Sequence, residues 1–333
     1  MSQSSYDALT IGNAIVDIIA RVDDDFLVRE NIHKGAMNLI DEARAQYLSS
    51  IIGSARIISG GSAANTAAGL AGFGGRAAFI GKVKADPSGH TFISDIHLAG
   101  VDFRTAATKE GPATARSFIL VTPDGQRSMN TYLGACQNLT THDVDAELIK
   151  KSGIVYLEGY LWDPPEAKRA FLKASEIAHA NGRRVALTLS DSFCVDRYRD
   201  EFLELIRSRI VDIVFANSSE LHSLYQTADF DTAVSALQAE KVLGIVTRSE
   251  LGSIVVTQDA VKIVPAQPIA GIVDTTGAGD LFAAGFLYGL SRNFAHAECA
   301  RLGSIAASEI IQHIGARPEA NLSELAAREP AQA

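Results

Sequence analysis

From residue 150 onward, short apolar segments alternate with longer segments of helical pattern, and this alternation restricts the fold more than any other feature of the chain. The apolar runs have strand length and the segments between them are long enough to cross one face of a sheet. The predicted strands are 154–157, 185–189, 211–216 and 243–247, and the predicted helices 165–180, 199–208, 219–225, 231–239, 278–290 and 297–313. Repeated strand–helix–strand units indicate an α/β fold with a doubly wound, mostly parallel sheet and flanking helices.

The first 130 residues have a different pattern, with more strands and shorter helices. We predict strands at 8–12, 15–22, 56–59, 77–81, 115–121 and 128–132, helices at 41–50 and 62–72, and, later, an antiparallel pair at 253–257 and 261–264. A Pro-Asp-Gly turn at 123–125 joins two of these strands as a hairpin. We expect a single domain over residues 1–333, a small strand-rich lid drawn from about 13–40 and 105–135, and a loosely ordered polar tail after Pro318.

Composition excludes several classes of protein. A content of 47% hydrophobic and 21% charged residues is that of a globular chain, and a net charge of −9 does not suit a nucleic-acid partner. The three cysteines lie far apart, which favours a reducing, cytoplasmic environment over a disulfide framework. The uncharged run 57–75 contains six glycines and several polar residues, so we do not predict a membrane span there.

The strongest local motif is Asp-Thr-Thr-Gly-Ala-Gly-Asp at 274–280, directly before an apolar helical segment. Gly277, Ala278 and Gly279 are small residues that leave the first N–H groups of the helix uncovered, and the helix dipole adds positive potential there. This arrangement predicts an anion hole for a phosphoryl group. Asp280, in the first helical turn, can accept a proton from an attacking hydroxyl. The alternative is an ordinary tight turn followed by an acidic residue.

A second motif, Gly-Gly-Ser-Ala-Ala-Asn at 60–65, lies between a predicted strand and a predicted helix. Gly60 and Gly61 allow a polar ligand to approach the backbone, and the Asn65 amide can both donate to and accept from a diol. The alternative is a plain helix start capped by Ser62. The chain has neither a Walker A motif nor a Gly-x-Gly-x-x-Gly motif after its first strand.

Together the two motifs resemble the signatures of the ribokinase-like (PfkB) carbohydrate and nucleoside kinases, and the resemblance covers nearly the whole chain. It implies ATP-dependent phosphorylation of a primary hydroxyl, with Asp280 as general base and the backbone of Gly277, Ala278 and Gly279 as anion hole. It also implies Mg²⁺ as a cofactor, and a monovalent cation is a further candidate.

The same resemblance implies roles for residues elsewhere in the chain. Residues 12–17 are similar to the family's first-strand element, in which Asn13 and Asp17 would bind the vicinal hydroxyls of the acceptor. Asn217 and Glu220 match an Asn-x-x-Glu element that organises Mg²⁺, largely through water. Segment 246–252 resembles the ATP-side loop, although Ser249 stands where glycine is common. The remaining nucleotide contacts would come from Thr247, Arg248 and Gly252 in this loop and from Ile305 and Ser308 on the last long helix.

Within the family the chain looks most like the adenosine kinases, on the basis of segments 12–17, 23–41, 126–129, 156–160 and 189–193. Arg127 matches a lid arginine that reaches toward the transferred phosphate. Tyr160 and Phe193 would face the purine and Met37 and Leu39 would contact the base from the lid, because a nucleoside needs an apolar wall that a free sugar does not.

The expected reaction is therefore the conversion of adenosine and ATP into AMP and ADP, by a monomer or a dimer. One alternative is a sugar kinase of the same family acting on ribose, fructose or 2-keto-3-deoxygluconate. The second is a non-catalytic regulator that binds a nucleoside or nucleotide. An intact Asp280 argues against the regulator, since a silent site has no need of a base.

Overall fold

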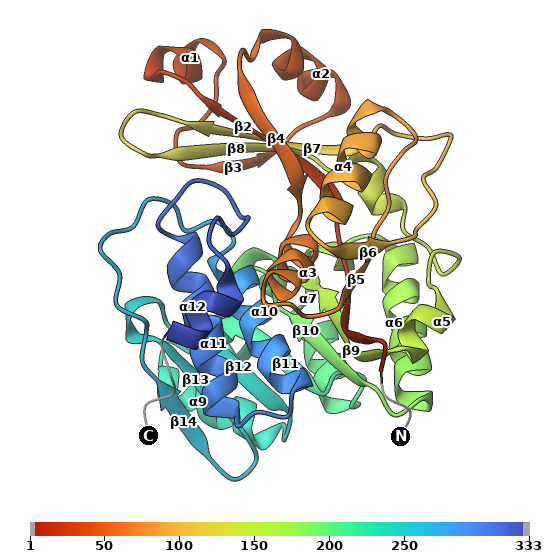
Figure 1. The fold of residues 1–333 in the computed structure, drawn as a ribbon, viewed down its shortest axis with the longest axis vertical. Coiled ribbons are helices and arrows are strands. Elements are labelled where there is room, and N and C mark those ends of the chain that lie inside the picture. Colours follow the sequence, from red (N-terminus) through yellow and green to blue (C-terminus); the bar gives the residue numbers. More distant parts are fainter. Residues whose placement is uncertain (1–3, 329–333) are drawn as a thin grey trace.

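The larger of two sheets forms the base of the molecule in the computed structural model, which describes residues 4–328 (Figure 1). Its strand order is β14-β13-β12-β11-β10-β9-β1-β5-β6. All neighbours are parallel except β12–β13 and β13–β14, which are antiparallel; of these two pairings only β13–β14 was predicted. The strands are β1 (Tyr6–Ile11), β5 (Ala77–Ile80), β6 (Val101–Phe103), β9 (Ser152–Glu158), β10 (Arg184–Thr188), β11 (Ile213–Asn217), β12 (Leu243–Thr247), β13 (Ser253–Val256) and β14 (Val261–Val264).

Helices cover both faces of this sheet because successive residues of each strand point to opposite sides. In β9, Val155 and Leu157 enter one apolar core, whereas Ile154 and Tyr156 enter the other. The first core is closed by α5 (Ala146–Lys150), α6 (Pro165–Ala180), α7 (Ser192–Arg207), α8 (Ser218–Tyr225) and α9 (Phe230–Ala239). The second is closed by α3 (Ser62–Gly72), α4 (Pro87–Leu98), α10 (Ala278–Ser291) and α11 (His296–Ile310). The predicted doubly wound α/β architecture is confirmed.

The smaller sheet lies at the other end of the molecule, above the larger sheet in Figure 1. It has the order β3-β8-β7-β2-β4 and is built from β2 (Ile15–Arg21), β3 (Met37–Leu39), β4 (Ala55–Gly60), β7 (Ala115–Val121) and β8 (Arg127–Tyr132). Two helices, α1 (Asp24–Arg29) and α2 (Glu42–Ile51), pack on its outer face through Leu27 and Leu48. Strand β4 thus lies outside the ranges 13–40 and 105–135 expected for a lid.

Two predictions of local structure are wrong. Helix α7 begins at Ser192 rather than near 199, because Asp191 caps it by accepting a hydrogen bond from the Cys194 N–H (2.6 Å), and non-helical geometry at Tyr198 interrupts its pattern. The tail after Pro318 is not loosely ordered as far as residue 328. It forms α12 (Leu322–Arg328), because Leu322 is fully buried in an apolar cluster with α10 and α11.

Cys136, Cys194 and Cys299 are all buried and free. The uncharged run 57–75 divides between β4, α3 and the turn after it. Among the helices of residues 4–328, none combines the length and the apolar character needed to cross a bilayer.

Candidate active site

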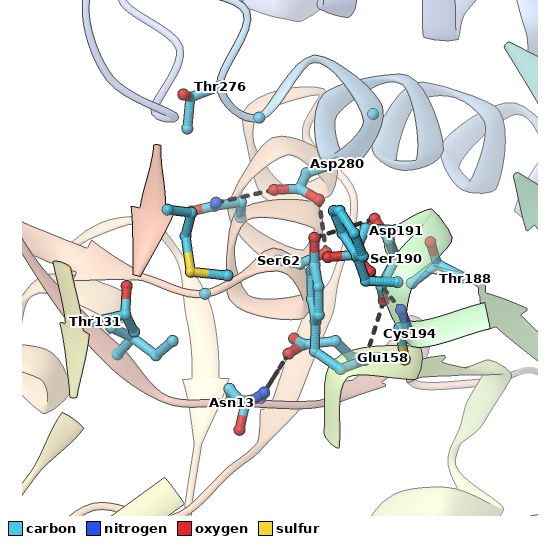
Figure 2. A pocket seen from close by; sticks show the side chains of 18 of the residues that line it. Asn13, Ser62, Thr131, Glu158, Thr188, Ser190, Asp191, Cys194, Thr276 and Asp280 are labelled. Atoms are coloured by element: carbon cyan, nitrogen blue, oxygen red, sulfur yellow. Dashed lines mark hydrogen bonds between the residues drawn. The ribbon is translucent and has the colours of Figure 1, made fainter. Parts of the chain in front are cut away.

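A cavity of about 700 Å³ lies between the small sheet and the ends of the large-sheet strands (Figure 2). It brings together motifs that are up to 260 residues apart in the sequence. The predicted site residues that line it are Asn13, Asp17, Met37, Leu39, Gly61, Asn65, Tyr160, Phe193, Asn217, Glu220, Thr247, Gly277, Gly279 and Asp280. The cavity is therefore the candidate active site.

The start of α10 forms one wall of this cavity. Gly277 is the residue that caps the helix, with a left-handed φ of +79°, and a Cβ atom there would lie 2.8 Å from the Cβ of Ala316. Gly279 faces open space. Within residues 4–328 the N–H groups of Gly277, Gly279 and Asp280 donate to no acceptor, whereas the Ala278 N–H donates to the Thr275 carbonyl (3.2 Å). Free N–H groups at the positive end of a helix suit an anion such as a phosphoryl group.

The Asp280 carboxylate is held by two donors from α3. It accepts hydrogen bonds from Ser62 Oγ (2.6 Å) and Asn65 Nδ2 (2.9 Å), as Figure 2 shows for Ser62. Burial raises the pKa of Asp280, and these two hydrogen bonds together with the charge of Arg317 oppose that rise. Gly61, not Ser62, caps α3, and so the Ser62 hydroxyl serves Asp280 and not the helix start. The carboxylate is thus oriented, with its charged form favoured by its neighbours.

Gly60 and Gly61, the two glycines before α3, are each required by a different close contact. Gly61 has a φ of +100°, and a Cβ atom on it would lie 2.0 Å from the Asn13 carbonyl oxygen. Gly60 does not line the cavity, but a Cβ atom on it would lie 2.2 Å from Asp17 Oδ2. Gly60 therefore makes room for the Asp17 side chain, and Gly61 lets the β1–β2 loop approach the start of α3.

Asp17, on β2, is a buried carboxylate that faces the cavity. It is 7% exposed, and no group within residues 4–328 donates a hydrogen bond to it. Burial raises its pKa to about 7, against the opposing charges of Arg317 and Arg127. A buried polar group without a partner is costly, so its acceptor oxygens are available to hydroxyl groups of a ligand.

Glu158, at the end of β9, is a cavity residue that the sequence did not single out. Its carboxylate accepts hydrogen bonds from Asn13 Nδ2 (2.7 Å) and from the Ala63 N–H (2.8 Å). Burial raises the pKa of Glu158 to about 7. The Asn13 amide is thereby tied to Glu158, and the β1–β2 loop, β9 and α3 are held together beside the cavity. The only signal in the sequence is an acidic residue that ends an apolar strand.

Two arginines connect the small sheet and the last loop to this region. Arg127, on β8, forms an ion pair with Asp274 and a hydrogen bond to Thr276 in the loop before α10. Asp274 also accepts hydrogen bonds from the N–H groups of Thr276 (2.9 Å) and Gly315 (2.8 Å). Arg317, which the sequence did not single out, donates to Asn65 Oδ1 (2.9 Å). No motif distinguishes it from other polar residues of the tail.

Large apolar side chains from both halves of the molecule also line the cavity. Met37 and Leu39 of β3 are 53% and 60% exposed, and Tyr160 and Phe193 are 39% and 77% exposed. The Tyr160 hydroxyl donates to the Ser190 carbonyl (3.1 Å), which fixes its ring. Four large apolar side chains held out of the core on opposite sides of one cavity form an apolar wall that can contact a flat ring.

Asn217 and Glu220 begin α8 and form a reciprocal capping box. Glu220 Nα donates to Asn217 Oδ1 (2.9 Å), and the Asn217 N–H donates to Glu220 Oε2 (3.0 Å). Both residues line the cavity, and burial raises the pKa of Glu220 to about 7. Over residues 4–328, no three His, Cys, Asp or Glu side chains are grouped so that they could hold a metal. The role of these two residues near a hydrated Mg²⁺ stays a prediction.

Most of the predicted ATP-side contacts lie away from the cavity. Arg248 stacks on the Phe230 ring, with its guanidinium carbon 4.2 Å from the ring centre. Gly252 has a φ of +82° and packs against the Val264 carbonyl, as a tight turn requires. Ile305 is buried, and Ser308 Oγ donates to its carbonyl (2.8 Å). Of this group only Thr247 lines the cavity, and the roles of the others in nucleotide binding stay predictions.

Comparisons with known proteins agree with this geometry. A family model described as pfkB family carbohydrate kinase matches residues 31–322. Adenosine kinase 2 of Arabidopsis thaliana is 26% identical over 94% of this chain and 96% of its own length. The crystal structure of adenosine kinase from Sinorhizobium meliloti is 55% identical, covers 98% of this chain and 99% of that chain, and has a TM-score of 0.91.

A second solved structure carries a different description. The probable sugar kinase from Rhizobium etli CFN 42 is 52% identical, with the same coverage of both chains and a TM-score of 0.92. The family model spans most of the chain, and it includes both the Gly-Gly-Ser-Ala-Ala-Asn and the Asp-Thr-Thr-Gly-Ala-Gly-Asp motifs. The resemblance on which the site was predicted is thus confirmed, and with it the class of reaction, phosphoryl transfer to an alcohol. The chain belongs to the pfkB family of carbohydrate kinases.

Proposed function

We propose that the protein transfers the terminal phosphoryl group of ATP to the 5′-hydroxyl of adenosine, giving AMP and ADP. One observation carries the proposal: Asp280, the free N–H groups at the start of α10 and the unpartnered Asp17 line the same cavity. A base, an anion hole and a hydroxyl-binding carboxylate are the groups that such a transfer needs.

Asp280 acts as the general base. Its carboxylate accepts the proton of the acceptor hydroxyl as that oxygen attacks phosphorus, and Ser62 and Asn65 hold it in position. The N–H groups of Gly277 and Gly279 stabilise the negative charge of the transferred group. Arg127 is bound to Thr276 and Asp274, next to the anion hole, and adds positive charge there from the small sheet.

The acceptor is bound at both of its ends. Asp17 accepts hydrogen bonds from the ribose hydroxyls, and Asn13 and Asn65 line the same cavity. Met37, Leu39, Tyr160 and Phe193 contact the purine. The descriptions of the Sinorhizobium meliloti and Arabidopsis thaliana relatives as adenosine kinases support this choice of acceptor.

Asn217 and Glu220 fit the surroundings of a magnesium ion but not its direct ligand shell. Each oxygen of Glu220 already accepts a hydrogen bond from Asn217, so water molecules would connect these side chains to the metal. Bound Mg²⁺ supplies charge neutralisation of the ATP phosphates. A monovalent cation is tested by replacing potassium with tetramethylammonium in the assay.

A sugar acceptor is the second candidate, because the 52% identical relative is described as a probable sugar kinase. The test is ADP release with adenosine, ribose, fructose and 2-keto-3-deoxygluconate, each supplied with ATP and Mg²⁺. We expect adenosine to give the highest kcat/KM. A higher value for any sugar would overturn the assignment of the acceptor. Binding of adenosine without ADP release from any acceptor would instead identify a non-catalytic regulator.

A further inference from the structure

Arg317 lies in the loop between α11 and α12 and reaches into the space between β4 and α3. Its Nη1 donates to Asn65 Oδ1 (2.9 Å) and to the Ala64 carbonyl (3.2 Å). Its Nη2 donates to the carbonyl (2.7 Å) and the hydroxyl (2.8 Å) of Ser59. The planar guanidinium therefore makes four hydrogen bonds in a fixed geometry, which a lysine could not reproduce.

The contact with Asn65 decides which way the Asn65 amide points. An amide has one accepting and one donating end, and the accepting oxygen is taken by Arg317. The donating Nδ2 must then point to the opposite side, where it reaches Asp280 Oδ2 (2.9 Å). Without the arginine, nothing in this pair of contacts prevents a rotated amide from placing its oxygen against the carboxylate.

The loop that carries Arg317 is fixed on both sides. Before it, the Gly315 N–H donates to Asp274 Oδ2 (2.8 Å). After it, the N–H groups of Glu319 and Ala320 both donate to Glu309 Oε1 (2.8 Å each). Since Asp274 also holds the loop before α10, the position of Arg317 is coupled to the position of the anion hole.

We propose that Arg317 is a positioning residue for phosphoryl transfer, which holds the Asn65 amide so that its NH₂ group orients the Asp280 carboxylate. The inference rests on the proposed function, because it takes Asp280 as the base. The charge of Arg317 also lowers the pKa of both Asp280 and Asp17, against the effect of burial. The other titratable groups that interact with Asp280 are Asp17 on β2 and Tyr156, Glu158 and Tyr160 on or after β9.

The test is the pH dependence of kcat for Arg317→Met, measured on whichever acceptor the wild-type protein phosphorylates. We expect kcat to fall by roughly 10-fold to 100-fold, a part of what a general base contributes. The acid limb of the profile should move to higher pH, since Asp280 loses an oriented donor. The KM for ATP and the calorimetric affinity for ADP should stay within about twofold. Arg317→Lys keeps the charge and one donor, so it should recover part of the loss.

A double variant shows whether Arg317 acts through Asn65. If it does, Asn65→Ala with Arg317→Met should be no slower than Asn65→Ala alone. Arg56→Met is the matched control, because Arg56 lies on β4 near the same loop and its one ion pair within residues 4–328 is with exposed Glu319. Its kcat and profile should be those of the wild type. If Arg317→Met does not fold, Arg317→Lys replaces it in the same comparison of single and double variants.

Two results would overturn the inference. One is an Arg317 variant that is folded and keeps the wild-type kcat and acid limb, and the other is a double variant whose loss is the product of the two single losses. A lower melting temperature with an unmoved acid limb also counts against it, as a purely structural role would do this. A wild-type protein that phosphorylates no acceptor would defeat the proposed function itself, which is a different outcome.

Discussion

The two sheets differ in what covers their faces, and the difference separates two halves of the proposed reaction. The large sheet is covered by helices on both faces, and the proposed base and anion hole lie at the start of α10, which packs on it. The small sheet is covered by α1 and α2 on one face only. Its other face presents Asp17, Ser117 and Thr131 to the cavity, in register on the neighbouring strands β2, β7 and β8. The proposed base and anion hole thus lie on the doubly covered layer and the proposed ribose contact Asp17 on the half-covered one, whereas the apolar wall takes side chains from both.

This division has a physical reason. A helix packed between a sheet and further helices cannot shift without disturbing a close-packed core, so donors at its start are preorganised. A sheet that carries helices on one face and faces a cavity with the other can move as a unit once the contacts that cross to the other half, such as Arg127–Asp274 and Arg317–Ser59, are released. We therefore propose that the small sheet closes over the bound acceptor as a lid and excludes water from the transfer.

The largest effect should come from Asp280→Asn, which removes the proposed general base from the large-sheet half. We expect kcat to fall by about 10²-fold to 10⁴-fold, because an amide cannot take the hydroxyl proton. The calorimetric affinity for the acceptor should change little, since Asp17 and the apolar wall are untouched. Asp259→Asn, an exposed residue in the β13–β14 turn, is the control. Near-normal turnover in Asp280→Asn would remove Asp280 from the mechanism.

The next largest effect should come from Asp17→Asn, which removes the proposed acceptor-binding carboxylate from the small-sheet half. Loss of a charge-assisted hydrogen bond should weaken acceptor binding by about 10-fold at pH 8 while changing kcat less. In the wild type the affinity should rise with pH through about 7, where Asp17 ionises, and this rise should be absent in the variant. Calorimetric titration from pH 6 to 8 measures both. Asp25→Asn, on the exposed side of α1, is the control. An unchanged affinity would place the acceptor hydroxyls elsewhere.

The same substitution should stabilise the unliganded protein. Folding raises the pKa of Asp17 from 3.8 to about 7, so between these values the folded state binds more protons than the unfolded state. Stability then falls as pH rises from 4 to 7, and the full cost is present above 7. Asp17→Asn removes this cost. Its melting temperature should exceed that of the wild type by a few degrees at pH 8 and equal it near pH 4. A difference that is independent of pH would contradict the raised pKa.

The contrast between the halves also explains what the sequence could predict. The base and the anion hole lie within one contiguous motif at a helix start, where local geometry follows from glycine and from the helix dipole. Glu158 and Arg317 could not be found in this way, because their roles arise from contacts with Asn13 and Asn65 more than 140 residues away. The large sheet was predicted well because its strands and helices alternate. The elements β3, β6, α1, α4 and α5 were not predicted, although the three helices have side-chain caps, Asp23, Asp86 and Asp145, that the sequence offers.

The smallest effect should come from Phe193→Ala, which sharpens the comparison by testing the acceptor itself. Phe193 is 77% exposed and lines the cavity at the start of α7, so its removal leaves the core unchanged. Loss of one aromatic contact should raise the KM for adenosine about threefold to tenfold, with kcat unaltered. Phe294→Ala, half-exposed but outside the cavity lining, should leave KM unchanged. Any residual turnover of ribose should be equal in Phe193→Ala and the wild type, because ribose lacks the purine that would contact the apolar wall. An equal loss with both acceptors would mean that Phe193 supports the cavity without recognising the base.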